Sequence, residues 1–152
     1  MSQLKIKQLS NAIEKFNKTF ALLKASVEKT ADYDTSITYS ADELEPYDAL
    51  SDRFMRTVEV AIKFFRSYEY YLQAEQSQTL RDGLHRMEKL ELITNIDVWF
   101  DMRDIRNRIV HDYVPEKIAE MYQLIRVEFY KELSLLDQKI KRIEFNSIAN
   151  VY

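Results

Sequence analysis

Hydrophobic residues recur at alternating spacings of three and four over most of this chain, which places them on one face of successive α-helices. The pattern predicts five helices, over residues 4–29, 46–74, 80–92, 99–111 and from 115 to about 140. The 152 residues include one glycine and two prolines, too few for a fold with many tight turns. We therefore expect an all-α protein, an antiparallel bundle of about five helices.

The first, second, third and fifth predicted helices each carry an apolar stripe that should face the core. In chain order these residues are Leu9, Ile13, Phe16, Phe20, Leu23, Val27, Leu50, Phe54, Val58, Ala61, Phe65, Tyr68, Leu72, Leu84, Met87, Leu90, Ile118, Tyr122, Ile125, Phe129, Leu133, Leu136 and Ile140. Phe64, Tyr70 and Tyr71 add aromatic surface beside the second stripe. Such surface can stack on nucleic-acid bases, but at helical spacing we interpret it as core or dimer contact.

Local signals suggest where the helices begin. Pro46 suits the first turn of the second helix. Ser77 or Thr79 can cap the third helix, and Thr94 with Asp97 resembles a capping pair for the fourth. The single glycine, at position 83, falls inside the third helix, where glycine costs about 1 kcal/mol relative to alanine. Its presence there suggests close packing.

Charge is distributed unevenly although the net charge is only −3. Residues 1–30 are rich in lysine, whereas residues 30–45 form a polar, acidic loop that is long for a compact domain. We expect one domain, with an N-terminal helix and acidic loop (1–45), a bundle core (46–143) and a flexible tail (144–152). The modest net charge does not indicate a strong nucleic-acid binder.

Composition excludes several classes of site. The chain has no cysteine, no glycine-rich phosphate loop, no Cys/His cluster and no His-Glu-x-x-His pair, so we expect neither a metal nor a cofactor. No apolar run approaches the roughly 18 residues of a membrane span, and the N-terminus lacks an apolar signal core. We expect a soluble, cytoplasmic protein without membrane contact.

The most unusual stretch is Arg106-Asn107-Arg108-Ile109-Val110-His111-Asp112-Tyr113, near the end of the fourth helix. At about 100° per residue, Arg106 projects from the apolar face of that helix. Its neighbours on that face are Trp99, Met102, Val110 and Tyr113, with Val98, Ile105 and Ile109 on one side. A buried guanidinium needs a carboxylate, a phosphate or a cleft. One interpretation is an ion pair with a core acid such as Glu59 or Glu69.

The alternative is a phosphate-cleaving site. His111 can move a proton to or from a ribose or leaving oxygen, and Arg106 can stabilise charge on a five-coordinate phosphate. Asn107 lies one turn before His111, and Arg103 one turn before Asn107. Because His111 lies about 140° from Arg106 on a regular helix, convergence requires distortion before Pro115 or pairing of two helices in a dimer. Spacing alone favours the ion pair.

The other histidine, His85, has no second potential metal ligand at useful spacing, so we interpret it as a surface histidine.

The segment Arg106-Asn107-x-x-x-His111-x-Tyr113 resembles the Arg-x4-6-His motif of the HEPN superfamily, and more narrowly the Arg-x4-His-x-Tyr form of HepT-like toxins. The flanks are similar too. They comprise Asp52-Arg53-Phe54, Lys63-Phe64-Phe65, Thr79-Leu80-Arg81-Asp82 and Asp101-Met102-Arg103-Asp104-Ile105. The resemblance extends over roughly residues 46–140.

This resemblance implies a HEPN-like helical bundle that dimerises through the motif helix and acts as a metal-independent endoribonuclease on RNA. It implies a toxin–antitoxin pair, in which a minimal nucleotidyltransferase neutralises the toxin by adding AMP to Tyr113. Arg106 and His111 would be catalytic, and Asn107 and Arg103 supporting polar groups. A related branch of the superfamily implies instead a non-catalytic subunit that binds nucleotide or substrate for a nucleotidyltransferase.

Overall fold

The computed structural model describes the backbone of residues 2–111 and 114–151, and the side chains within these ranges except at 2, 106, 109–111 and 144–151. Every regular element in this part of the chain is helical. The elements are α1 (Ser2–Lys29), α2 (Ala41–Gln73), α3 (Leu80–Lys89), α4 (Ile96–His111), α5 (Pro115–Leu124), the π-helical η1 (Ile125–Phe129) and α6 (Tyr130–Val151). Since α5, η1 and α6 follow without a break, they form one continuous helical run. The prediction of an all-α protein with about five helices is confirmed.

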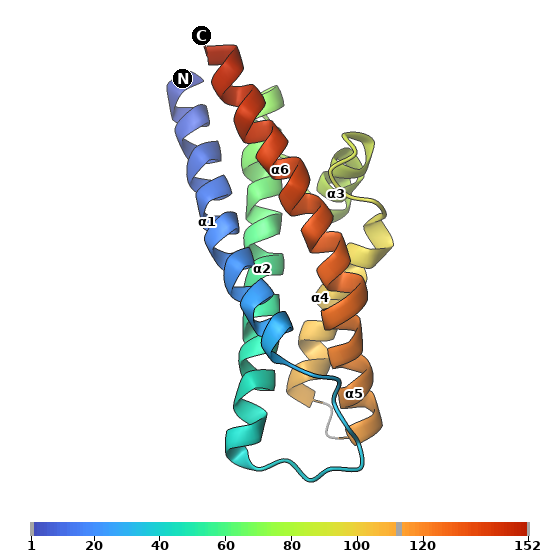
Figure 1. Ribbon diagram of the computed structural model, residues 1–152. Coiled ribbons are helices and arrows are strands. Elements are labelled where there is room, and N and C mark those ends of the chain that lie inside the picture. The colour runs from blue at the N-terminus through green and yellow to red at the C-terminus, as the bar shows by residue number, and fades with distance from the viewer. Residues whose placement is uncertain (1, 112–113, 152) are drawn as a thin grey trace.

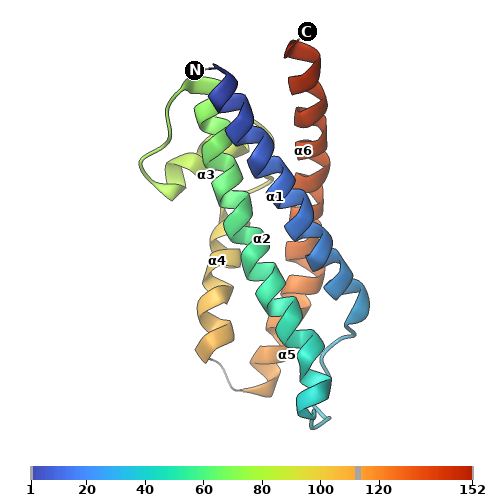
Figure 2. The same cartoon turned by 90° about the vertical axis from the view of Figure 1, so that its left-hand side faces the viewer.

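The long helices form an antiparallel bundle (Figure 1). α1 and α4 run in one direction, whereas α2 and the continuous α5–η1–α6 run return in the other. α1 lies along α2, and the turned view shows α4 on the opposite side of α2 from the upper part of α6 (Figure 2). The short α3 lies near the end of α2 from which the chain turns back into α4. This order places α4 against α2, with α3 at its entrance.

Most of the predicted core positions are buried. Val27, Tyr68 and Ile118 are half-buried, whereas Leu72 and Leu90 are 44% and 45% exposed because they lie at the ends of α2 and α3. Phe64 is fully buried and stacks on Tyr68. The interpretation of this aromatic residue as core is therefore confirmed. α2 buries more than one stripe because helices cover it on several sides.

α2 begins five residues before the predicted start at Pro46. Ser40 caps it: the Ser40 hydroxyl accepts from the Glu43 amide at 3.2 Å, and Glu43 accepts from the Ser40 amide at 3.2 Å. This reciprocal capping box satisfies two amides that a helix otherwise leaves unpaired. The helix therefore starts at the capping box and contains Pro46, and the acidic loop ends at residue 40.

The start of α4 also differs from the prediction. Thr94 does not cap the helix, because its amide and hydroxyl donate to Glu132 of α6 at 2.9 and 2.6 Å. Asn95 takes the capping role by accepting from the Asp97 amide at 2.7 Å. The buried Glu132 also accepts from the Trp99 indole at 3.2 Å. One carboxylate of α6 thus anchors the first turn of α4. The predicted cap at Thr79 of α3 is confirmed by its bond from the Asp82 amide.

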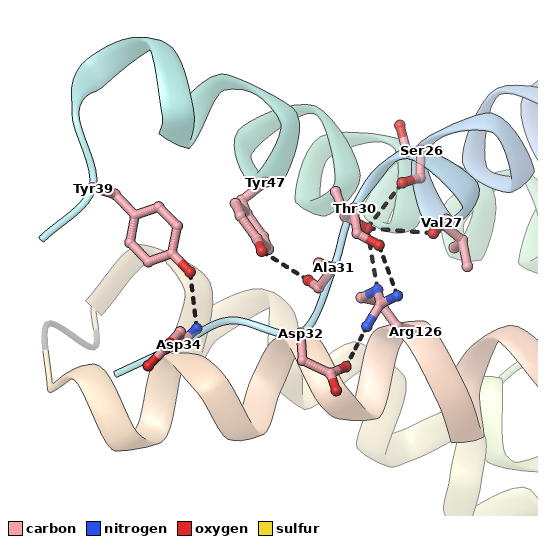
Figure 3. Close-up of polar contacts among 9 residues, drawn as sticks. All are labelled: Ser26, Val27, Thr30, Ala31, Asp32, Asp34, Tyr39, Tyr47 and Arg126. Atoms are coloured by element: carbon pink, nitrogen blue, oxygen red, sulfur yellow. Dashed lines mark hydrogen bonds and ion pairs between the residues drawn. The ribbon is translucent and has the colours of Figure 1, made fainter. Parts of the chain in front are cut away.

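The loop between α1 and α2 is held against α5 and η1 by an arrangement that we call the clasp, comprising Thr30, Asp32, Tyr33, Tyr39, Tyr47, Tyr122 and Arg126. The Arg126 guanidinium donates to the Thr30 hydroxyl at 3.1 Å, to the Thr30 carbonyl at 2.7 Å and to Asp32 at 2.5 Å. Figure 3 shows these contacts converging on Arg126. The start of the acidic loop is therefore held to the bundle by the Arg126 guanidinium.

The tyrosines of the clasp pack around the same loop. The Tyr33 ring contacts those of Tyr39, Tyr47 and Tyr122, with centroids 4.6 to 5.5 Å apart. The Tyr47 hydroxyl donates to the Ala31 carbonyl at 2.7 Å (Figure 3). Burial raises the pKa of Tyr47 to about 12, and Tyr39 contributes in the same direction. These contacts keep the loop packed on the helices.

At the other end of the chain, α6 continues to Val151, whereas we expected a flexible tail over residues 144–152.

Among the helices of the described residues, none combines the length and the apolar character needed to span a membrane.

Candidate functional site

A groove with a cavity volume of about 770 Å³ lies between α2 and α4 and is bounded by α3. The residues that line it are Met55, Val58, Glu59 and Ile62 of α2, Arg81 of α3, and Phe100, Asp101, Met102, Arg103, Asp104 and Asn107 of α4. We call this feature the α2–α4 groove. Its volume is within the range of roughly 300–1,000 Å³ typical of small-molecule sites.

Two of the predicted site residues lie in the groove. Arg103 and Asn107 are one helical turn apart on α4, both are exposed, and both line the cavity. The prediction that they share a face of the helix is confirmed. Their guanidinium and amide groups supply hydrogen-bond donors to this space.

The remaining predicted site residues lie at the end of α4 or beyond it. Arg106 and His111 belong to the helix, but their side chains lie outside the described residues, as does the whole of Tyr113. Their convergence therefore stays a prediction. The helical register does place Arg106 on the α4 face whose described members Trp99, Met102 and Ile105 are buried.

The chain leaves helical geometry where Pro115 predicts it should. Val114 has φ −80° and ψ 121°, an extended conformation, and α5 starts with Pro115. The proline ring disfavours helical geometry in the preceding residue. The motif therefore lies next to a sharp change of chain direction between α4 and α5.

The ion-pair interpretation of Arg106 named two carboxylates, which the structure distinguishes. Glu69 is 3% exposed and accepts from Arg86 at 2.9 Å and from the Ser77 hydroxyl and amide. It therefore already has a cationic partner, and it attaches α3 to α2. Glu59 is exposed and lines the α2–α4 groove.

Sequence reasoning did not identify Arg81 and Phe100 as a pair. The carbon at the centre of the Arg81 guanidinium lies 4.6 Å from the centroid of the Phe100 ring, within the range of a cation–π contact. Arg81 precedes Phe100 by 19 positions and sits on another helix, so periodicity carries no signal for the contact. The sequence does carry a signal for Phe100, which lies one helical turn before Arg103 and Asp104 and therefore near them on the helix surface.

The charge of the groove is mixed. Among the described residues that line it, Arg81 and Arg103 are accompanied by the carboxylates of Glu59, Asp101 and Asp104. Within the described residues, no cluster of histidine, cysteine, aspartate or glutamate has an arrangement that could hold a metal ion. His85 is exposed on α3 and does not line the groove, in agreement with its interpretation as a surface residue.

Comparison with known proteins identifies a family. No curated protein matches the chain. A family model described as "nucleotidyltransferase substrate binding protein like" matches residues 5–142. The match includes nearly all of α1, so the family resemblance extends further toward the N-terminus than the residues 46–140 that we expected. By this match over most of its length, the chain belongs to the nucleotidyltransferase substrate-binding-protein-like family.

Proposed function

We propose that this protein is the helical partner of a nucleotidyltransferase and that, in this pairing, it is a metal-independent endoribonuclease toxin which the nucleotidyltransferase neutralises. The observation that carries the proposal is the exposure of two α4 residues in one cavity, Arg103 one turn before the Arg106–His111 motif and Asn107 within it. A motif helix with a purely structural role would have no need of an open polar groove beside it. The family description, which names a nucleotidyltransferase, supports the choice of partner.

The proposed chemistry uses two side chains at the end of α4. His111 accepts the proton of a ribose 2′-hydroxyl and later donates a proton to the leaving oxygen, while Arg106 stabilises the five-coordinate phosphate. The reaction requires both groups at one phosphate. We propose that two copies of α4 pair in a homodimer, so that the motif of each copy contributes to a shared site.

The proposed inactivation acts at Tyr113. An AMP group on its hydroxyl would add bulk and negative charge close to the site where Arg106 meets the substrate phosphate. The pair would act in the cytoplasm, where RNA and nucleoside triphosphates are present. Intact-mass measurement after co-expression with the nucleotidyltransferase should show added AMP. An adduct that persists in Tyr113→Phe would contradict this assignment.

The catalytic assignment is tested by growth inhibition. Arg106→Ala and His111→Ala should each abolish growth inhibition and RNA cleavage by the purified protein while leaving the helical circular dichroism spectrum unchanged. Arg108→Ala is the matched control, since Arg108 is exposed on the same helix and does not line the groove. Full toxicity of Arg106→Ala or of His111→Ala would overturn the assignment.

A second candidate function is a non-catalytic subunit that binds the substrate of a nucleotidyltransferase. The wording of the family description favours it. Purified protein that binds nucleotide through Arg103 and Asn107 but cleaves no RNA, and whose expression does not slow growth, would support this candidate over the endoribonuclease.

A further inference from the structure

The wall of the α2–α4 groove carries a ready stacking surface. Arg81 is exposed, Phe100 is half-buried, and their contact at 4.6 Å holds the guanidinium beside the cavity. A guanidinium plane and an aromatic ring are the two kinds of side chain on which unstacked bases are commonly held. The contact joins α3 to α4, so both helices have to be in place to form it.

The same wall is rich in hydrogen-bond acceptors. Asp104 lies one turn after Phe100, about 40° away around the helix axis, so the two side chains share a stripe of α4. Among the residues that the structure describes, neither Asp104 nor Asp101 forms an ion pair. Ionised carboxylates only accept hydrogen bonds. This part of the groove therefore suits a ligand that donates.

The charged residues of the groove also indicate which part of a nucleotide would bind there. Among the described residues that line the groove, the carboxylates of Asp101 and Asp104 offset the charges of Arg81 and Arg103, so this part of the groove does not attract a phosphate as a whole. A nucleobase, in contrast, is flat and uncharged, and it presents N–H donors at its edge. A phosphate attached to that base would be favoured toward Arg103 and the motif, since Arg106 lies about 9 Å further along α4 than Phe100.

We propose that the α2–α4 groove is a nucleobase subsite with a preference for guanine. The base stacks on the Arg81–Phe100 pair, and Asp104 accepts hydrogen bonds from its Watson–Crick edge. Guanine presents two adjacent donors on that edge, which one carboxylate can accept together. Adenine and cytosine present one amino group, and uracil presents only a ring N–H. This inference rests on the proposed function, since it assigns a base preference to the groove beside the proposed catalytic motif.

The subsite is tested by titrating the full chain with GMP and with UMP and following binding by calorimetry. Wild-type protein should bind GMP at least about tenfold more tightly than UMP. Arg81→Lys keeps the charge but loses the planar group, and Phe100→Leu keeps apolar volume but loses the ring. Each should weaken GMP binding about fivefold or more. Asp104→Asn should reduce the preference for GMP over UMP.

Arg66→Lys provides the matched control, because Arg66 is exposed on α2 and does not line the groove. It should bind GMP as the wild type does. Equal binding of GMP and UMP, or wild-type GMP affinity in Arg81→Lys, would overturn the subsite. Because Arg81 is exposed, its replacement by lysine leaves the fold intact, and circular dichroism checks this.

Failure of this inference is distinguishable from failure of the proposed function. If GMP binding does not depend on Arg81 but growth inhibition depends on Arg106, the subsite is wrong and the endoribonuclease stands. If Arg106→Ala stays toxic while Arg81→Lys and Asp104→Asn alter nucleotide binding as expected, the subsite stands without the endoribonuclease.

Discussion

The clasp and the α2–α4 groove both combine arginine with acidic and aromatic residues, but their arginines have different surroundings. In the clasp, the Arg126 side chain is 18% exposed and donates to Thr30 and Asp32, while tyrosine rings pack around the loop. In the groove, the guanidinium of Arg103 is exposed and has no ion-pair partner within the described part of the chain.

This difference separates stability from function. An arginine whose donors are satisfied by the protein stabilises the fold, and removing it leaves acceptors without partners. An arginine exposed in a groove contributes little to stability. Because no protein group occupies its donors, they are available to a ligand. The clasp should therefore respond to mutation in unfolding experiments, whereas the groove should respond in binding and activity. The following predictions test that separation, from the largest expected effect to the smallest.

Arg126→Ala should lower the free energy of unfolding by about 2–3 kcal/mol, because the Thr30 carbonyl and hydroxyl lose a charged donor. The exposed Asp32 contributes little to this loss, since water screens its ion pair. Urea denaturation measures the change. GMP binding by the folded variant should stay as in the wild type. A loss below about 0.5 kcal/mol would show that the clasp does not stabilise the fold.

Alkaline pH should weaken the clasp through Tyr47, whose folded pKa is raised to about 12 because burial disfavours the phenolate. An unfolded tyrosine titrates near pH 10, so the stabilisation is fully present below pH 10 and is lost as the pH rises toward 12. The loss from this residue grows with pH and reaches about 2 kcal/mol near pH 12. Urea denaturation at pH 9 and pH 11 should show a smaller decrease in Tyr47→Phe than in the wild type. Equal decreases would contradict the role of Tyr47.

Gly83→Ala should stabilise the protein by about 0.5–1 kcal/mol, because alanine favours the helix more than glycine does. A Cβ atom at this position would lie 3.5 Å from a Glu69 carboxylate oxygen and 3.8 Å from the Ser77 Cβ, both ordinary contacts. The packing here is therefore close enough to touch but leaves room for a methyl group. Thermal unfolding measures the effect, and destabilisation would show that α3 cannot accept the extra atom.

Arg103→Ala should change the free energy of unfolding by less than about 0.5 kcal/mol, as expected for an exposed residue that forms no ion pair with the described residues. The same variant should reduce RNA cleavage and nucleotide binding. Comparison with Arg126→Ala in one denaturation series provides the sharpest contrast between groove and clasp. A destabilisation of similar size in the two variants would remove the distinction.

Much of the fold could be predicted because amphipathic helices report their own buried faces. The stripe from Leu9 to Leu23 and the stripe from Tyr122 to Ile140 are buried as their spacing predicts. The errors occurred where long-range contacts override local signals. Thr94 has the sequence of a cap, but Glu132, 38 residues away, binds both its amide and its hydroxyl.

The site was predictable only in part, for a related reason. Arg103 and Asn107 lie on one helix, so their shared face follows from the helical repeat. The Arg81–Phe100 contact depends on how α3 packs across α4, which periodicity does not specify. Nor did the acidic composition of the loop after α1 reveal that Arg126, 94 residues beyond Asp32, would bind it.

The sequence by itself determined the helices, their core faces and the motif from Arg106 to Tyr113, because each depends on residues a few positions apart. Only the tertiary structure decided which charged residues the protein satisfies internally and which it leaves exposed in a groove. That choice depends on distances between helices that are far apart in the chain. The division between clasp and groove is therefore a property of the assembled bundle.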